Sequence, residues 1–209
     1  VRVHGHAWSC ETREAPADRR RAWEPLSLPA SFVRGKTYLL DKNASVTVAL
    51  GDGSRFVLSS GAEIRALKTG AGAFRSFLAS GTFTARVKGP RKSPFVVMTP
   101  NARCEVKGTR FRVEVEATPP SEPAQTALLV TEGAVMMKAR EGSDRGRLIE
   151  TGQRAMMRGA ILESLEQVEL PEVPSKQDAW FPGEQDGADP VDTPALLSLA
   201  SRPAGADVF

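Results

Sequence analysis

The feature that most constrains the fold of this chain is a two-residue alternation of apolar and polar side chains that recurs through its middle. In the stretch VTVALGDGSRFVL, Val46 and Val48 fall on one face of an extended strand, and Phe56 resumes the pattern after Asp52-Gly53. An Asp-Gly dipeptide between two alternating runs favours a β-hairpin, because it accepts the positive φ angles of a type I′ turn. The stretch therefore predicts two antiparallel strands joined by a tight turn.

Runs of the same kind continue as far as Arg158, and turn residues separate them at intervals of about 8–14 residues. Helical periodicity is missing between Tyr38 and Arg158. We therefore expect an all-β body, built as an antiparallel or irregular sandwich or as a solenoid-like stack of short hairpins. We assign the body to residues 34–170, between an extended N-terminal arm (1–33) and a Pro- and Gly-rich tail (171–209).

The stretch ASFVRGKT, Ala30 to Thr37, fits a permissive form of the phosphate-binding loop pattern. A functional loop of this kind must follow a buried strand and open a helix, so that backbone N–H groups converge on phosphate. Here two prolines bracket the few apolar residues upstream, and alternation typical of strands follows. The sequence therefore predicts no nucleotide site, and Lys36 is expected to be a solvated residue where a strand begins.

Charge argues against nucleic acid as a partner, and hydropathy argues against a membrane-spanning segment. The chain has 28 Lys and Arg against 25 Asp and Glu, and its arginines are scattered singly apart from Arg19–Arg21. A nucleic-acid binder concentrates basic residues on one face, so no nucleic acid is expected. No apolar run is long enough to span a bilayer, so we expect no transmembrane segment in this chain. The sequence starts at Val1, and we expect a signal or anchor upstream of it.

The residues suited to metal binding and cross-linking are few. The chain has two cysteines, Cys10 and Cys104, which could form one disulfide in an oxidising compartment, or Cys104 could be free and buried in a strand. His4 and His6 could share a metal with Cys10, but a stable site needs further ligands and supporting partners. We therefore predict no metal and no cofactor.

The arm and the tail carry isolated apolar residues among polar spacers. The tail holds six prolines with many Gly, Asp and Ser, and it cannot bury enough apolar surface to fold alone. Segments of this composition can dock on a partner through their apolar positions. The residues that we expect to bind a partner are Trp8, Trp23, Trp180, Phe181, Leu196, Leu197 and Phe209.

Six short motifs follow one another in order between residues 35 and 158. They are Asp52-Gly53-Ser54, Gly81 with Phe83 and Val87, Pro94-Phe95, Gly108-Thr109 with Phe111 and Val113, Glu132-Gly133 with Val135, and Gly152-Gln153. Each motif alone is weak, but the ordered set is specific. The set closely resembles the FecR domain, the periplasmic sensor region of bacterial ferric-citrate-type regulators.

The resemblance implies a fold and a broad role, and it implies no active site. The motif glycines are expected where a turn needs positive φ or where two backbones pass closely, and the phenylalanines are expected in the core. In the regulators a cytoplasmic helical segment binds a sigma factor, a membrane helix follows, and a small αβ subdomain closes the chain. This sequence shows neither helix, and its tail lacks alternating α and β elements. Sigma-factor inhibition is therefore not predicted.

We expect a non-enzymatic FecR-like domain of the bacterial periplasm or cell envelope. It would act through protein–protein contacts, as a sensor in signalling or as an accessory structural subunit of a larger envelope complex. One alternative is a glycan- or peptidoglycan-binding β domain, with Arg91 and Lys92 of the loop GPRKSP in contact with the glycan. A weaker alternative is a hydrolase, which would need two carboxylates at a spacing that the sequence does not define.

Overall fold

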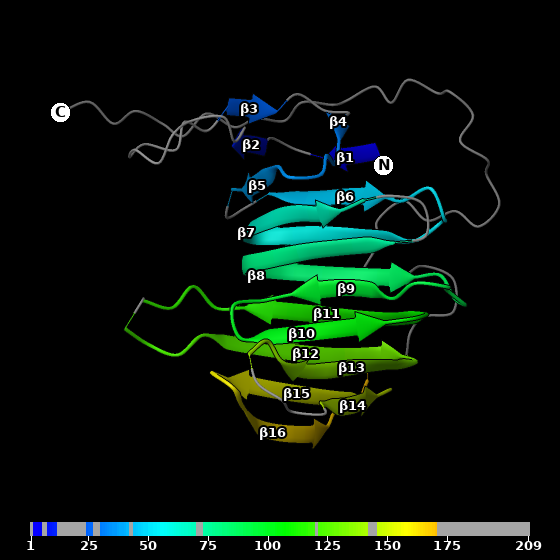
Figure 1. The fold of residues 1–209 in the computed structure, drawn as a ribbon, viewed down its shortest axis with the longest axis vertical. Coiled ribbons are helices and arrows are strands. Elements are labelled where there is room, and N and C mark those ends of the chain that lie inside the picture. The colour runs from blue at the N-terminus through cyan, green and yellow to red at the C-terminus, as the bar shows by residue number, and fades with distance from the viewer. Residues whose placement is uncertain are drawn as a thin grey trace.

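The computed structural model describes residues 2–5, 8–11, 24–26, 30–41, 44–69, 73–119, 121–141 and 146–170. These residues form strands and connecting turns with no helix, which confirms the all-β prediction (Figure 1). The strands are β1 (Arg2–Gly5), β2 (Trp8–Glu11), β3 (Glu24–Leu26), β4 (Ala30–Ser31), β5 (Thr37–Leu40), β6 (Ser45–Ala49), β7 (Arg55–Lys68), β8 (Phe74–Val87), β9 (Phe95–Met98), β10 (Ala102–Val106), β11 (Thr109–Val115), β12 (Gln125–Glu132), β13 (Ala134–Ala139), β14 (Arg147–Glu150), β15 (Gln153–Arg158) and β16 (Ile161–Gln167).

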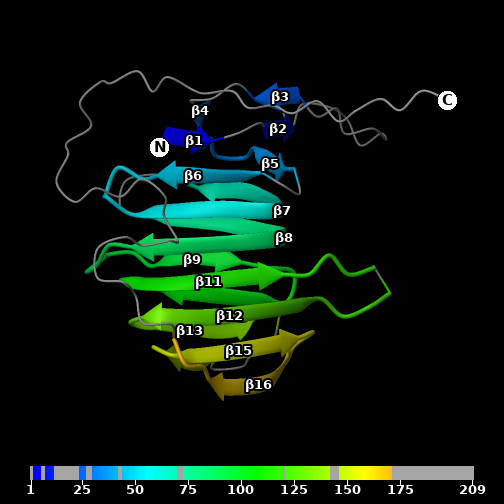
Figure 2. The same ribbon diagram turned by 180° about the vertical axis from the view of Figure 1, so that it is seen from behind.

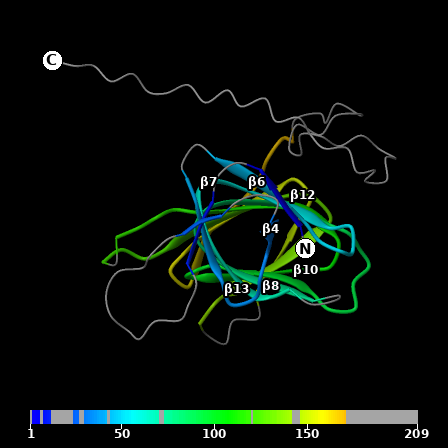
Figure 3. The ribbon, with the colours of Figure 1, turned by 90° about the horizontal axis from the view of Figure 1, so that it is seen from above.

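All the strands belong to one hydrogen-bonded sheet that curls over on itself (Figure 3). The long hairpin of β7 and β8 makes this possible, because each of its strands serves both layers. On one edge of β8 the first half pairs with β9 in parallel and the second half pairs with β11 in antiparallel orientation. On the edge of β7 that faces away from β8, the first half of β7 pairs with β6 and the second half pairs with β5.

The curl separates the sheet into two layers. The first layer contains β6, the first half of β7, the second half of β8, β11, β12, β15 and β16. The second layer contains β5, the second half of β7, the first half of β8, β9, β10, β13 and β14. After β8, successive hairpins alternate between the layers, so the strands stack from β6 down to β16 (Figure 2).

A sharp bend in the β7–β8 hairpin carries both strands from one layer to the other. The pairing passes from Ser59 opposite Thr82 to Glu63 opposite Ser80, so β7 carries extra residues at the bend. Gly81 has φ +87°, and a Cβ built on it would lie 2.4 Å from Cα of Ala62. Only glycine combines this backbone conformation with such close packing, so Gly81 is required for the sharp bend.

The chain crosses between layers at a column of glycines along one edge. A Cβ on Gly108 would lie 2.9 Å from Cα of Gly89, and one on Gly133 would lie 2.8 Å from the carbonyl oxygen of Gly108. Beside the column, the Thr109 hydroxyl donates a hydrogen bond to the carbonyl of Ala134 at 2.9 Å, which ties β11 in one layer to β13 in the other. Close passage of the crossing backbones explains why these positions lack side chains.

Stacked aromatic rings fill the space between the layers. Phe56, Phe83 and Phe111 face inward from the first layer, and Phe74 and Phe95 face inward from the second; all five are buried. The ring centroids of Phe74 and Phe95 are 4.2 Å apart, those of Phe56 and Phe74 are 5.3 Å apart, and those of Phe83 and Phe95 are 6.1 Å apart. Each such pair adds about 0.5–1.5 kcal/mol beyond its buried area, so this cluster holds the layers together.

A buried polar network joins the layers at the turn between β9 and β10. The side-chain NH₂ of Asn101 donates to the carbonyl of Met157 at 2.9 Å, and its side-chain carbonyl accepts from the Thr126 hydroxyl at 2.6 Å. The Thr99 hydroxyl lies 2.9 Å from that of Thr126 and accepts the N–H of Ala102 at 2.9 Å. Each of these polar groups has a hydrogen-bond partner, so the network fixes the alignment of the two layers.

Residues before 34 add strands to the sheet and a ring to the core. β1 pairs with β6, and β2 pairs with β5, so the segment that we assigned to an arm extends both layers. Phe32 is 2% exposed and stacks on Tyr38, whose hydroxyl accepts the N–H of Val33 at 2.7 Å. The phosphate-loop-like stretch is a turn at Gly35 followed by β5, so no helix N-terminus is available there for phosphate.

Candidate interaction site

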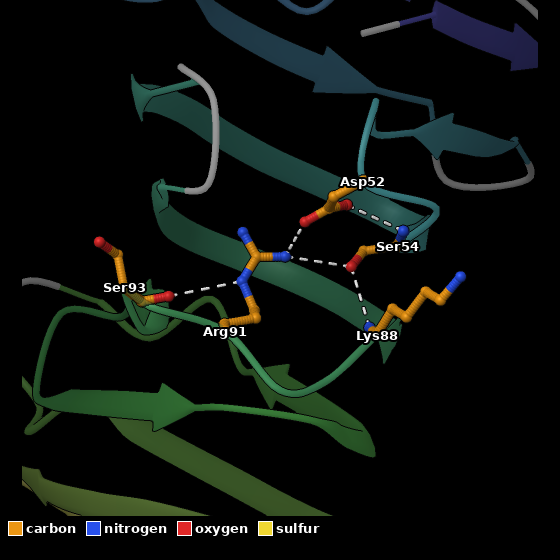
Figure 4. A network of polar contacts seen from close by, with 5 residues as sticks. All are labelled: Asp52, Ser54, Lys88, Arg91 and Ser93. Atoms are coloured by element: carbon orange, nitrogen blue, oxygen red, sulfur yellow. Dashed lines mark hydrogen bonds and ion pairs between the residues drawn. The ribbon is translucent and has the colours of Figure 1, made fainter.

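The loop between β8 and β9 carries a network of charged and polar groups around Arg91 (Figure 4). The Arg91 guanidinium forms an ion pair with the Asp52 carboxylate and donates to the Ser54 hydroxyl at 3.1 Å. The Ser54 hydroxyl also accepts the N–H of Lys88 at 2.9 Å, and the Ser54 N–H donates to Asp52 Oδ1 at 2.9 Å. The network therefore links the β6–β7 turn to the loop that crosses from the first layer to the second.

This geometry bears on the glycan-binding alternative, in which Arg91 and Lys92 contact the glycan. The Arg91 side chain is only 5% exposed, and its guanidinium carbon lies 5.7 Å from the centroid of the Phe95 ring. Its charge is used inside the fold, so Arg91 cannot serve as the proposed glycan contact without breaking this network. Lys92 is exposed.

The charge of Asp52 is stabilised by the same contacts. Partial burial raises the pKa of this carboxyl, but the hydrogen bonds from Ser54 and the charge of Arg91 outweigh it, so the pKa lies below its ordinary value of 3.8. Asp52 is therefore an ionised structural acid at neutral pH.

The motif residues that the sequence singled out have structural positions. Gly53, Gly81, Gly133 and Gly152 have φ between +80° and +87°, and Gly108 is crowded by Gly89. The rings of Phe83, Phe95 and Phe111 are buried, Pro94 is half-buried directly before β9, and Thr109 bonds across the layers. These placements match the roles of positive φ, close passage and core filling that the sequence predicted for the glycines and the phenylalanines.

Cys104 lies in β10, where it is free and fully buried. Burial raises the pKa of its thiol to about 12, so the side chain stays protonated and unreactive at neutral pH. The side chains of Cys10, His4 and His6 lie outside the described part of the structure. Within the described ranges, no three His, Cys, Asp or Glu side chains are grouped closely enough to hold a metal ion.

The residues predicted to bind a partner are mostly outside the described ranges. The backbone of Trp8 lies in β2, opposite Leu40 of β5. Trp23, Trp180, Phe181, Leu196, Leu197 and Phe209 fall on residues that the structure does not describe. Their role in binding therefore stays a prediction.

A surface that the sequence analysis missed lies on the outward side of the second layer. One row of outward-facing side chains crosses β7, β8, β9, β10 and β13 in register: Arg65, Phe77, Met98, Arg103 and Lys138. Phe77 and Met98 are directly opposite each other and only half-buried. Large apolar groups on this outward side are thus partly accessible to solvent.

A second row runs beside the first and repeats its mixture of apolar and charged groups. It consists of Arg75, Val96, Glu105, Met136 and Leu148. Leu148 is 47% exposed, and Met136 opposite it is half-buried. We call the surface formed by these two rows and Arg140 the basic–apolar face.

Two features set the electrostatics of the basic–apolar face. Glu105 Oε1 lies 2.8 Å from Arg103 Nε and 2.9 Å from Lys138 Nζ, and the hydrogen bond from Lys138 is the main cause that holds the pKa of Glu105 below its ordinary value. Arg140 is exposed, and its guanidinium carbon lies 5.3 Å from the centroid of the Phe77 ring. One acid thus balances two of the cations, and the exposed Arg75 and Arg140 leave the face positively charged.

The sequence signal available for this face is the pair of neighbouring methionines Met136-Met137. Neighbouring residues of a strand point to opposite sides, and Met137 is buried while Met136 is half-buried and faces outward. The outward residues of β8, β9 and β10 could not be assembled from sequence. Their proximity depends on the parallel pairing of β8 with β9, which no local pattern encodes.

Comparison with known proteins agrees with the fold. The family described as FecR protein matches residues 36–136, and no curated protein sequence matches the chain. Two crystal structures of a candidate anti-sigma factor from Parabacteroides distasonis are similar to the chain, with a TM-score of 0.53 and 17% sequence identity. The match covers 64% of this chain but only 60% of that protein, so the chain spans less than two thirds of its neighbour's length.

Those two neighbours share the fold with this chain. Within the described residues, no helix has the length and apolar character needed to cross a bilayer. The ordered motifs, the curled sheet and the match over residues 36–136 agree with one another. The β body of this chain thus contains a match to the FecR family over residues 36–136.

Proposed function

We propose that this chain is a regulatory module that acts through protein–protein contacts and performs no catalysis. The observation that carries the proposal is the basic–apolar face, where partly exposed Phe77, Met98 and Leu148 lie among arginines on a scaffold whose motif residues are structural. Exposed apolar groups bordered by charged ones are typical of protein-binding surfaces. The match to the FecR family and the name of the neighbour as a candidate anti-sigma factor support a regulatory role.

The titratable groups with shifted pKa values support the non-enzymatic part of the proposal. Partial burial raises the pKa of Asp52, but hydrogen bonds from Ser54 and the charge of Arg91 outweigh it and lower that pKa. The hydrogen bond from Lys138 lowers the pKa of Glu105, and burial raises the pKa of Cys104. A general acid or base needs a pKa near the operating pH, and a nucleophile needs a lowered pKa or an adjacent base. In the described part of the chain, these three groups are held in states that serve stability.

The location that we propose is the bacterial periplasm or another compartment of the cell envelope. The resemblance to sensor domains of envelope regulators supports it, and the proposed partner is another envelope protein. The chain would act as a sensor or as an accessory subunit of a larger complex, with the tail (171–209) as a docking segment.

Deletion of residues 171–209 tests this division of labour. We expect the melting temperature of the body to change little, because the buried core of the described residues runs from Phe32 to Met157. We expect the deletion to release the partner, since the tail contributes docking residues. The measurement is affinity purification of the full and the shortened chain from the native envelope, followed by identification of the co-purifying proteins.

Two results would contradict the proposal. Unfolding of the shortened chain would show that the tail belongs to the core. Recovery of the same partners by both chains would show that the tail is not a docking segment.

A further inference from the structure

The basic–apolar face has the composition of a receptor for an acidic segment with aromatic anchors. Phe77, Met98, Met136 and Leu148 offer partly exposed apolar surface, and Met is well suited to contacts with aromatic rings. Arg75 and Arg140 are exposed beside them. A ligand that buries apolar groups here must also bring negative charge close to these arginines.

The tail of the same chain has the complementary composition. Residues 171–209 contain two basic residues, Lys176 and Arg202, against seven acidic ones, so their formal charge is −5 while that of the whole chain is +3. The remaining 170 residues therefore carry +8. The aromatic pair Trp180-Phe181 lies between acidic residues, with Asp178 before it and Glu184 and Asp186 after it.

The tail also starts close enough to reach the face. The N–H of Val168 donates to the carbonyl of Gly152 at 2.7 Å, so the chain leaves β16 beside the turn that joins β14 of the second layer to β15 of the first. The ten residues from 170 to 180 span up to about 33 Å when extended. The path from β14 across β13, β10 and β9 to β8 is four strand spacings, or about 19 Å.

From this complementarity we infer that the tail docks on the basic–apolar face of its own chain, with Trp180 and Phe181 as its anchors. The aromatic pair packs on Met98, Met136 and Leu148, and the flanking acids lie near Arg75 and Arg140. The remainder of the tail, from Ala195 to Phe209, is then presented to the partner. The docked tail then forms part of the surface that the partner contacts at the basic–apolar face. The inference rests on the proposed function for that last step only, because the intramolecular contact is independent of any partner.

Photo-crosslinking in the full chain tests the contact. A benzophenone side chain replaces Phe181, and crosslinked peptides are identified by mass spectrometry at a protein concentration that favours monomers. We expect crosslinks to Met98 or Met136 of the same chain and none to Met156, which is half-buried on the outward side of β15 in the other layer. A mixture of isotopically light and heavy protein separates crosslinks within one chain from crosslinks between copies.

Charge reversal supplies the matched variants. We expect Arg75→Glu with Arg140→Glu to lower the crosslink yield about fivefold, the size expected when exposed ion pairs are lost. Arg154→Glu with Arg158→Glu, on the outward side of β15, should leave the yield unchanged. Circular dichroism and thermal melting verify that both variants are folded.

Four results would each overturn the inference. They are crosslinks to Met156, crosslinks only between copies, the absence of crosslinks, and a crosslink yield that is the same in the variant with Arg75→Glu and Arg140→Glu as in the wild type.

The same variants separate the docking contact from the proposed function. Partners that co-purify with the wild type while no crosslink forms would refute the docking contact alone. A crosslink at Met98 or Met136 with no co-purifying protein would refute the proposed function and leave the contact standing.

Discussion

Single glycines decide whether the chain can bend and cross between the two layers. Gly81 has both a positive φ and a neighbouring backbone at 2.4 Å from a built Cβ, whereas Gly108 has only the close neighbour. Gly51 has neither, since a Cβ there would meet nothing within 4 Å. These three residues therefore separate the effects of conformation and crowding.

Substitution by larger residues should separate the two crowded glycines, Gly81 and Gly108, from the open one, Gly51. We expect Gly81→Ala and Gly108→Val each to lower the free energy of unfolding by about 1–3 kcal/mol, because strain and displaced backbone persist in the folded state. Gly51→Ala, the control, should change it by less than about 0.5 kcal/mol. Urea titrations followed by circular dichroism give the values, and a neutral Gly108→Val would disprove the crowded crossing.

The ion pair of Asp52 predicts a pH dependence. Its pKa is lower in the folded protein than the ordinary 3.8, so its stabilising contribution is present above pH 3.8 and is lost as the pH falls through the folded-state pKa. At pH 7, Asp52→Asn should cost about 1–3 kcal/mol, because the nearly buried Arg91 loses a charged acceptor. The difference in unfolding free energy from wild type should shrink below pH 3.8.

Urea unfolding of both proteins from pH 7 to pH 2.5 measures this dependence, and the exposed Asp41→Asn serves as control. A difference that stays constant across the whole range would show that Asp52 is not ionised in the folded state.

The sequence predicted the Asp52-Gly53 turn from local chemistry alone. It could not predict the partner of Asp52, because Arg91 lies 39 positions away and meets it only through the tertiary fold.

The element that organises the molecule is β8, which belongs to both layers. Alternation in the sequence predicted strands and tight turns in this part of the chain, because the period of two is a local property of a strand. The curl was not predictable, since it depends on the parallel pairing of β8 with β9 and on the bend at Gly81. The boundary at residue 33 likewise divides residues that the sheet keeps together, as Phe32 in the core shows.

The polar bridge at the β9–β10 turn tests how strongly the layers depend on each other. We expect Asn101→Ala to cost about 2 kcal/mol, because it removes the acceptor of the buried Thr126 hydroxyl and the side-chain donor to the Met157 carbonyl. The combined effect of Asn101→Ala and Thr126→Val should be smaller than the sum of the single effects, since both remove the same hydrogen bond. Strict additivity in a double-mutant cycle would show that the bridge is not formed.

At the scale of the whole molecule, the interaction surface that we propose is a face of the sheet and not a loop. The sequence predicts partner contacts in the arm, in the tail and at the GPRKSP loop, where isolated aromatic and basic residues are visible. The basic–apolar face is not visible in the sequence, because its members come from six strands separated by up to 83 positions, Arg65 to Leu148. Such a surface exists only once the sheet has curled.

The measurement that tests the account most directly is the pairing of β8 in solution, read from proton–proton contacts in NMR spectra of the full chain. The account predicts that Phe74–Phe77 contacts Phe95–Met98 in parallel order, while Gly81–Val87 contacts Thr109–Val115 in antiparallel order. Both sets of contacts from one strand would establish the curled sheet and the outward face that it builds. Antiparallel order in the first pair, or helical contacts after residue 35, would contradict the account.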